Sequence, residues 1–167
     1  MGVDKISLSK TFLFTALMCL CVVVSWATRD VVFFRDYAII WEGVGRMLSG
    51  YSPFSDIGMP IGPVVFYIPY IFADLFGFTW FNFQLSQLFQ SLLLIIIGSC
   101  IVGRLNTSRK VYYWAVALYS LWFVCFLMHP WYNSTALLLL LLALYFSLLR
   151  HSGWLLLAGA CTGLCVF

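Results

Sequence analysis

The chain has 167 residues, of which 63% are hydrophobic and only 9% are charged, and its mean hydropathy is +1.01. This apolar content excludes an ordinary soluble domain and predicts an all-α integral membrane protein. The net charge of +3 is too small to indicate nucleic-acid binding. All six cysteines lie inside apolar runs, so we interpret them as small core residues and not as metal ligands or disulfide partners.

The first apolar run, Thr11 to Ala27, carries no charge and is near the lower length limit for a membrane-spanning helix. Its basic lead, Lys5 and Lys10, and its small residues Ser25 and Ala27 also fit a signal peptide with a cleavage site. Under either interpretation, the chain from Thr28 onward lies outside the cytoplasm.

Four later apolar runs predict further spanning helices, which makes the expected fold a multi-span helical bundle. The last run stops with the chain at Phe167, without a polar flank or a basic anchor, so the sequence predicts the N-terminal part of a longer polytopic protein. The four runs are Trp80–Val102, Val111–Leu127, Trp131–Leu149 and the incomplete Trp154–Phe167.

The basic residues predict the orientation of these spans. Cytoplasmic loops of membrane proteins are enriched in lysine and arginine. If the N-terminus lies in the cytoplasm, every connection on the cytoplasmic side contains a basic residue. The loop 28–79 then lies on the extracytoplasmic side. The basic residues on the cytoplasmic side are Lys5, Lys10, Arg104, Arg109, Lys110 and Arg150.

The external loop 28–79 carries five of the six acidic residues of the chain, between Asp30 and Asp74. Within it, Tyr37 to Leu48 has apolar residues at helical spacing and predicts an amphipathic helix in the membrane interface. Val64 to Phe78 is also apolar but too short to span comfortably. We therefore expect two juxtamembrane helices, separated by turns rich in glycine and proline.

Several short motifs of this loop resemble the first external loop of the GT-C glycosyltransferases. They are Asp36-Tyr37, the helix end Met47-Leu48-Ser49-Gly50, the turn Tyr51-Ser52-Pro53-Phe54, the group Pro60-Ile61-Gly62-Pro63 and finally Leu75-Phe76-Gly77. The family includes protein mannosyltransferases, aminoarabinose transferases acting on lipid A, and bacterial polyprenyl-linked mannosyl- and arabinosyltransferases. The resemblance implies a bundle with two juxtamembrane helices and a polyprenyl-phosphate-linked sugar as donor.

The resemblance matches Asp36 to the acidic residue that opens this loop in the family, where it implies a general base. Sugar transfer from a polyprenyl phosphate to a hydroxyl needs a group that takes the acceptor proton. Because the lipid of the donor stays in the bilayer, this base has to lie at the membrane surface. The alternative for Asp36 is a purely structural N-cap of the following helix.

The sequence departs from the family pattern at two places. Tyr37 follows Asp36 where mannosyltransferase-type members have a second acid, and Met128 to Ser134 offers His129 and Asn133 where many members have an acid. Both departures argue against a metal ion held between the two loops. No cofactor is therefore assigned, and a divalent metal stays an open alternative.

Five residues are candidates for binding the donor or the acceptor. Guanidinium groups match phosphate geometry, although arginines near headgroups are common. Glutamines of the expected span Trp80–Val102 either line a cavity below the loop or mark the wet end of that helix. A histidine among aromatic residues also fits an interface belt. The candidates are Arg35, Arg46, Asp56, Gln87 and His129.

The expected function is thus transfer of a sugar to a glycan, lipid or protein acceptor on the extracytoplasmic side of a plasma, inner or ER membrane. A non-catalytic, polymerase-type or ligase-type subunit of envelope glycan assembly is the alternative, kept open by the missing second acid. A transporter is less favoured, because the later apolar runs have no charged residue in their interiors.

Overall fold

The computed structural model describes residues 8–27, 35–52, 64–105, 108–125, 132–149 and 152–166. Within these ranges the chain forms seven helices and no strand, which confirms the all-helical fold. The helices are α1 (Leu8–Ala27), α2 (Arg35–Leu48), α3 (Val64–Phe76), α4 (Trp80–Arg104), α5 (Arg109–Cys125), α6 (Tyr132–Ser147) and α7 (Ser152–Val166).

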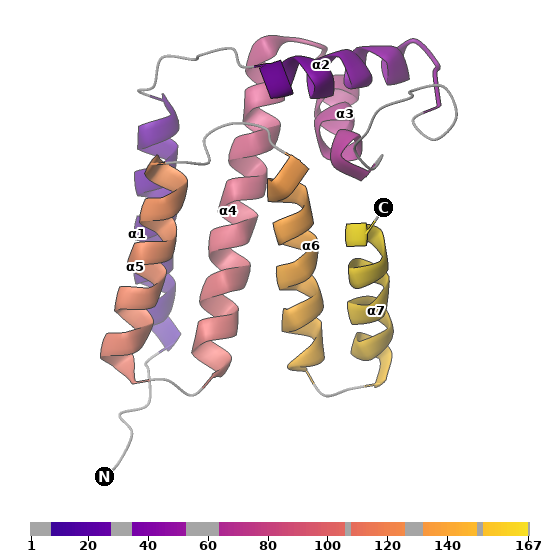
Figure 1. Cartoon of the computed structure of the whole chain (residues 1–167). Helices are drawn as coiled ribbons and strands as arrows, with labels where there is room; N and C mark the ends of the chain where they lie inside the picture. Colours follow the sequence, from indigo (N-terminus) through magenta and orange to yellow (C-terminus); the bar gives the residue numbers. More distant parts are fainter. Residues whose placement is uncertain are drawn as a thin grey trace.

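The long helix α4 occupies the centre of the bundle (Figure 1). Helices α1 and α5 run beside it on one side, α6 and α7 follow on the other, and α2 lies across one end of α4. We call this end, which also carries the turn 77–79, the α2 end. With 25 residues, α4 is the one helix among the described residues that is long and apolar enough to cross a membrane, while the other apolar helices are shorter.

A tight turn, residues 77–79, joins α3 to α4. Gly77 has a positive φ of 95°, a conformation that glycine adopts without steric cost. Thr79 caps α4, its hydroxyl accepting from the backbone N–H of Asn82 at 3.2 Å. The side-chain amide of Asn82 then donates to the carbonyls of Phe76 and Gly77 at 2.8 and 2.9 Å. This network satisfies carbonyls at the end of α3 and fixes where α4 begins.

The orientation of α3 differs from the sequence expectation. The two loop helices were expected to lie in one plane, but only α2 runs across the bundle, while α3 packs alongside the first turns of α4 (Figure 1). The reason is the short turn 77–79, which returns the chain antiparallel to α3. Buried residues spread over α3, namely Val65, Phe66, Pro69 and Ala73, fit this enclosed position.

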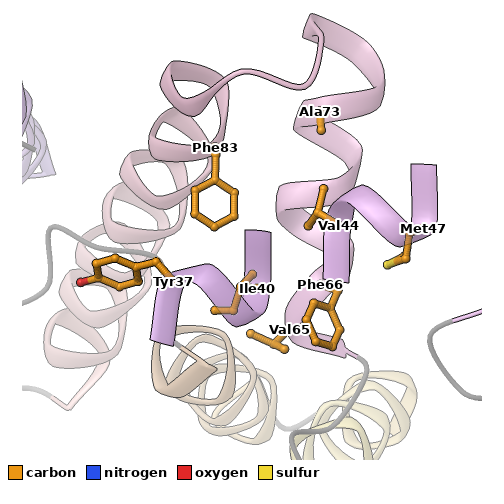
Figure 2. Packing of buried hydrophobic residues seen from close by; sticks show 8 residues of the cluster. All are labelled: Tyr37, Ile40, Val44, Met47, Val65, Phe66, Ala73 and Phe83. Carbon is orange, nitrogen blue, oxygen red and sulfur yellow. The ribbon is translucent and has the colours of Figure 1, made fainter. Parts of the chain in front are cut away.

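The apolar face of α2 packs on α3 and on the start of α4. Figure 2 shows its residues Tyr37, Ile40 and Val44 near Phe66 of α3 and Phe83 of α4. Ile40, Val44, Phe66 and Phe83 are each at most 1% exposed. The helical spacing predicted an amphipathic helix with this apolar face toward the membrane, whereas in the structure the face packs on α3 and α4.

Candidate functional site

The predicted catalytic residue, Asp36, is the second residue of α2 and lies in its first turn. Arg35, one of the binding candidates, begins the same helix. Two further candidates, Asp56 and His129, lie outside the described residues.

Arg46 forms an ion pair with Glu42 one turn earlier on α2, its Nη2 donating to Oε1 of the carboxylate. Its guanidinium group makes Arg46 a predicted ligand of the donor phosphate. The pair changes the electrostatics of that position, because the carboxylate offsets the guanidinium charge that would attract a phosphate. Both side chains stay about half exposed, at 47% and 58%, so they remain accessible to a ligand.

The C-terminal end of α2 forms a Schellman motif. Gly50 adopts a positive φ of 90°, and its N–H donates to the carbonyl of Met47 at 3.0 Å. The N–H of Tyr51 donates to the carbonyl of Arg46 at 3.1 Å, the longer bond of this motif. The motif therefore holds Tyr51 back against the last turns of α2.

A hollow of about 410 Å³ lies between the outward side of α2 and the turn 77–79. It is an open hollow of the surface and not an enclosed cavity. Trp41 stacks on Phe78 at a centroid distance of 4.0 Å and an interplanar angle of 20°, which fixes one wall. The hollow, called here the α2 pocket, is lined by Trp41, Glu42, Gly45, Arg46, Ser49, Tyr51 and Phe78.

A second polar group lies inside the bundle, between α4 and α6. Ser134 donates to Oε1 of Gln87 at 3.2 Å, and Thr135 donates to Oε1 of Gln90 at 2.8 Å. All four side chains are at most 4% exposed. Gln87, a predicted ligand-binding residue, is thus engaged within the bundle, and these bonds fix the register of α4 against α6.

Gln84 lies one turn before Gln87 on α4 and is 4% exposed. Its Nε2 is a buried donor for which the described part of the chain offers no acceptor. A buried donor without a partner in a native fold is commonly explained by a bound ligand or an ordered water.

The described residues contain no group of three histidine, cysteine or acidic side chains placed to hold a metal ion.

Sequence reasoning missed four residues that the structure makes prominent: Tyr51, Phe78, Ser134 and Thr135. Each acquires its place through a contact with another element, either across a turn or over 45 to 47 positions of the chain. The turn that begins with Tyr51-Ser52 was the one sequence feature near the α2 pocket that could be recognised within a single segment.

Comparison of the chain with protein families, with curated proteins and with solved structures gives no match.

Proposed function

We propose that the chain is a multi-pass membrane protein with its N-terminus in the cytoplasm. The observation that supports this is the distribution of polarity. Glutamine, serine and threonine side chains are buried between helices, whereas large apolar side chains cover the outer sides of α1 and α5. A water-soluble fold buries its apolar side chains and rarely exposes such surfaces. Phe12 and Leu13 of α1 and Trp114 of α5 are among them, at 75%, 70% and 69% exposure.

Charge segregation supports the same orientation. The described acidic residues, Asp36, Glu42 and Asp74, all belong to α2 and α3, and they outnumber the two arginines of these helices, Arg35 and Arg46. The opposite end of the bundle carries Arg104 at the end of α4 and Arg109 and Lys110 at the start of α5. Basic residues concentrate on the cytoplasmic side of membrane proteins, which makes the α2 end extracytoplasmic.

We infer further that the chain belongs to a glycosyltransferase that moves a sugar from a polyprenyl-phosphate donor to an acceptor hydroxyl. The position of Asp36 supports this best: it lies in the first turn of a helix that crosses the bundle end, packed on α3 and α4. A base there meets an acceptor outside the membrane while the donor lipid remains among the helices. Asp36 takes the proton from the acceptor hydroxyl, and the sugar–phosphate bond breaks as the new glycosidic bond forms.

The test is sugar transfer by the complete protein carrying Asp36→Asn. Asparagine keeps the size of the side chain but removes its ability to accept a proton, so transfer should fall by about a hundredfold to ten-thousandfold while folding survives. Asp74→Asn is the matched control, because Asp74 is an exposed acid on the neighbouring helix α3. Transfer from a polyprenyl-phosphate sugar and the thermal midpoint are measured for both variants.

Near-normal transfer by Asp36→Asn rules out the catalytic assignment. Inactivity of the native protein with every polyprenyl-phosphate sugar tried favours the non-catalytic subunit of glycan assembly instead.

A further inference from the structure

The α2 pocket combines aromatic surface with a balanced pair of charges. Tyr51 and Phe78 leave 54% and 39% of their surface exposed around it. Because these rings lie beside charged side chains, they offer an apolar face next to polar groups, which is the combination that a ligand with both kinds of surface requires.

The polar side of the pocket offers both acceptors and donors without net charge. Glu42 and Arg46 neutralise one another across one helical turn, and the guanidinium has donors beyond the one used by the carboxylate. The hydroxyl of Ser49 donates to the carbonyl of Gly45 at 3.0 Å, so its oxygen remains free to accept. A free phosphate would meet the carboxylate of Glu42 as well as the arginine, which disfavours an anionic ligand.

A neutral sugar ring has the chemistry that this lining recognises. Its C–H face is apolar and packs on an aromatic ring, while neighbouring hydroxyls donate to a carboxylate and accept from a guanidinium. We propose that the α2 pocket binds a sugar ring of the acceptor. This inference rests on the proposed function, because it gives the acceptor a place on the helix that begins with Asp36.

The pocket and position 36 lie on different sides of α2. Glu42 and Arg46 follow Asp36 by six and ten residues, which corresponds to about 9 and 15 Å along a helix axis. With about 3.6 residues per turn, these offsets also rotate positions 42 and 46 well away from position 36, so a sugar ring in the pocket is a unit of the acceptor remote from the reacting hydroxyl.

The pocket is preformed by local backbone structure. The Schellman motif at Gly50 positions Tyr51, and the Asn82 bonds to the carbonyls of Phe76 and Gly77 hold the turn that carries Phe78. Gly45 forms part of the lining, and a Cβ atom there would meet the Phe78 ring at 3.4 Å. A longer side chain at position 45 would accordingly enter the pocket without displacing backbone.

The experiment measures binding of methyl glycosides of mannose, glucose, galactose and arabinose to the purified full chain by saturation-transfer NMR. The detergent is zwitterionic, because detergents with sugar headgroups would compete. We expect at least one glycoside to bind. Gly45→Leu, which fills the pocket, and Tyr51→Ala, which removes an aromatic wall, should each weaken that binding by about tenfold or more.

Gly159→Leu is the matched control, since it makes the same substitution in α7 at a glycine with nothing within 4 Å of its Cβ position. It should bind the glycoside like the native chain. The thermal midpoint of each variant shows whether a loss of binding follows from unfolding. If Tyr51→Ala is unstable, Tyr51→Phe replaces it as a test, and this variant should retain binding because it keeps the aromatic ring.

Absence of binding for all four glycosides, or unchanged binding by a folded Gly45→Leu, overturns the pocket assignment. Neither result bears on the proposed reaction, because that reaction is tested separately by sugar transfer in the Asp36→Asn variant. Conversely, glycoside binding that Gly45→Leu abolishes, in a protein that transfers no sugar, retains the pocket and rejects the transferase.

Discussion

Gly43 of α2 lies directly against the ring of Phe66 of α3: a Cβ atom added to the glycine would be 2.4 Å from Cε1 of that ring. Phe66 is 1% exposed and packs among Ile40 and Val44, so its ring has little room to move. The absence of a side chain at position 43 is what allows α2 to cross α3 so closely. The α2 pocket and Asp36 both depend on this crossing, because they lie on the same helix.

We therefore predict that Gly43→Ala destabilises the chain. Overpacking of a filled core typically costs about 1 to 3 kcal/mol, which exceeds the gain in helix propensity of up to about 1 kcal/mol. Unfolding by dodecyl sulfate in mixed micelles measures the difference. Adding Phe66→Leu to Gly43→Ala should recover part of the loss, whereas Gly159→Ala, which meets nothing within 4 Å, should not destabilise. A neutral Gly43→Ala variant would contradict the close crossing.

The second prediction concerns Gly50, whose Cβ position is open but whose φ is +90°. Gly50→Ala should cost about 1 to 2 kcal/mol, because an L-residue with a β-carbon is strained in this region. Gly50→Asn should cost less, since asparagine tolerates the left-handed conformation better. The variant with the lower free energy of unfolding should also show the greater exposure of Tyr51, which fluorine NMR of fluorotyrosine measures. Equal stability of the alanine and asparagine variants would argue against the Schellman motif.

The third prediction concerns the hydrogen bond of 2.8 Å from Thr135 to Gln90. Thr135→Val keeps the shape of the side chain but leaves the buried Oε1 without this donor, so it should cost about 1 to 3 kcal/mol. In a Gln90→Leu background the same substitution should cost less, because no acceptor remains to be stranded. The four unfolding free energies form a double-mutant cycle, and a coupling near zero would show that the bond does not join α4 to α6.

How much of this arrangement the sequence predicted depends on the range of the interactions. The apolar residues of α2, such as Ile40 and Val44, follow a helical period that is readable within one segment, and they form one face of a helix as predicted. Composition also predicted the helical class, because apolar runs without turn signals leave no alternative. These are properties of single segments.

The candidate site depends on contacts between segments, which a single sequence does not record. The pairing of Gln90 with Thr135 joins residues 45 positions apart, whereas the sequence suggested for the glutamines of this helix either a cavity lining or a wet helix end. The orientation of α3 was mistaken because the tight return at Gly77 was not recognised as a hairpin. The pocket likewise needs Tyr51 and Phe78 to meet α2 from two different turns.

The last prediction tests which end of the bundle faces outward. In a cysteine-free background, Ser49→Cys at the end of α2 should react with a membrane-impermeant thiol reagent in intact cells, because Ser49 is exposed at the α2 end. Ser108→Cys should be protected until the cells are opened, since Ser108 precedes the basic start of α5 and is exposed at the opposite end. Both sites are polar and exposed, which makes them matched reporters. Labelling of Ser108→Cys alone in intact cells would reverse the orientation and place Asp36 in the cytoplasm, where the proposed extracytoplasmic transfer does not take place.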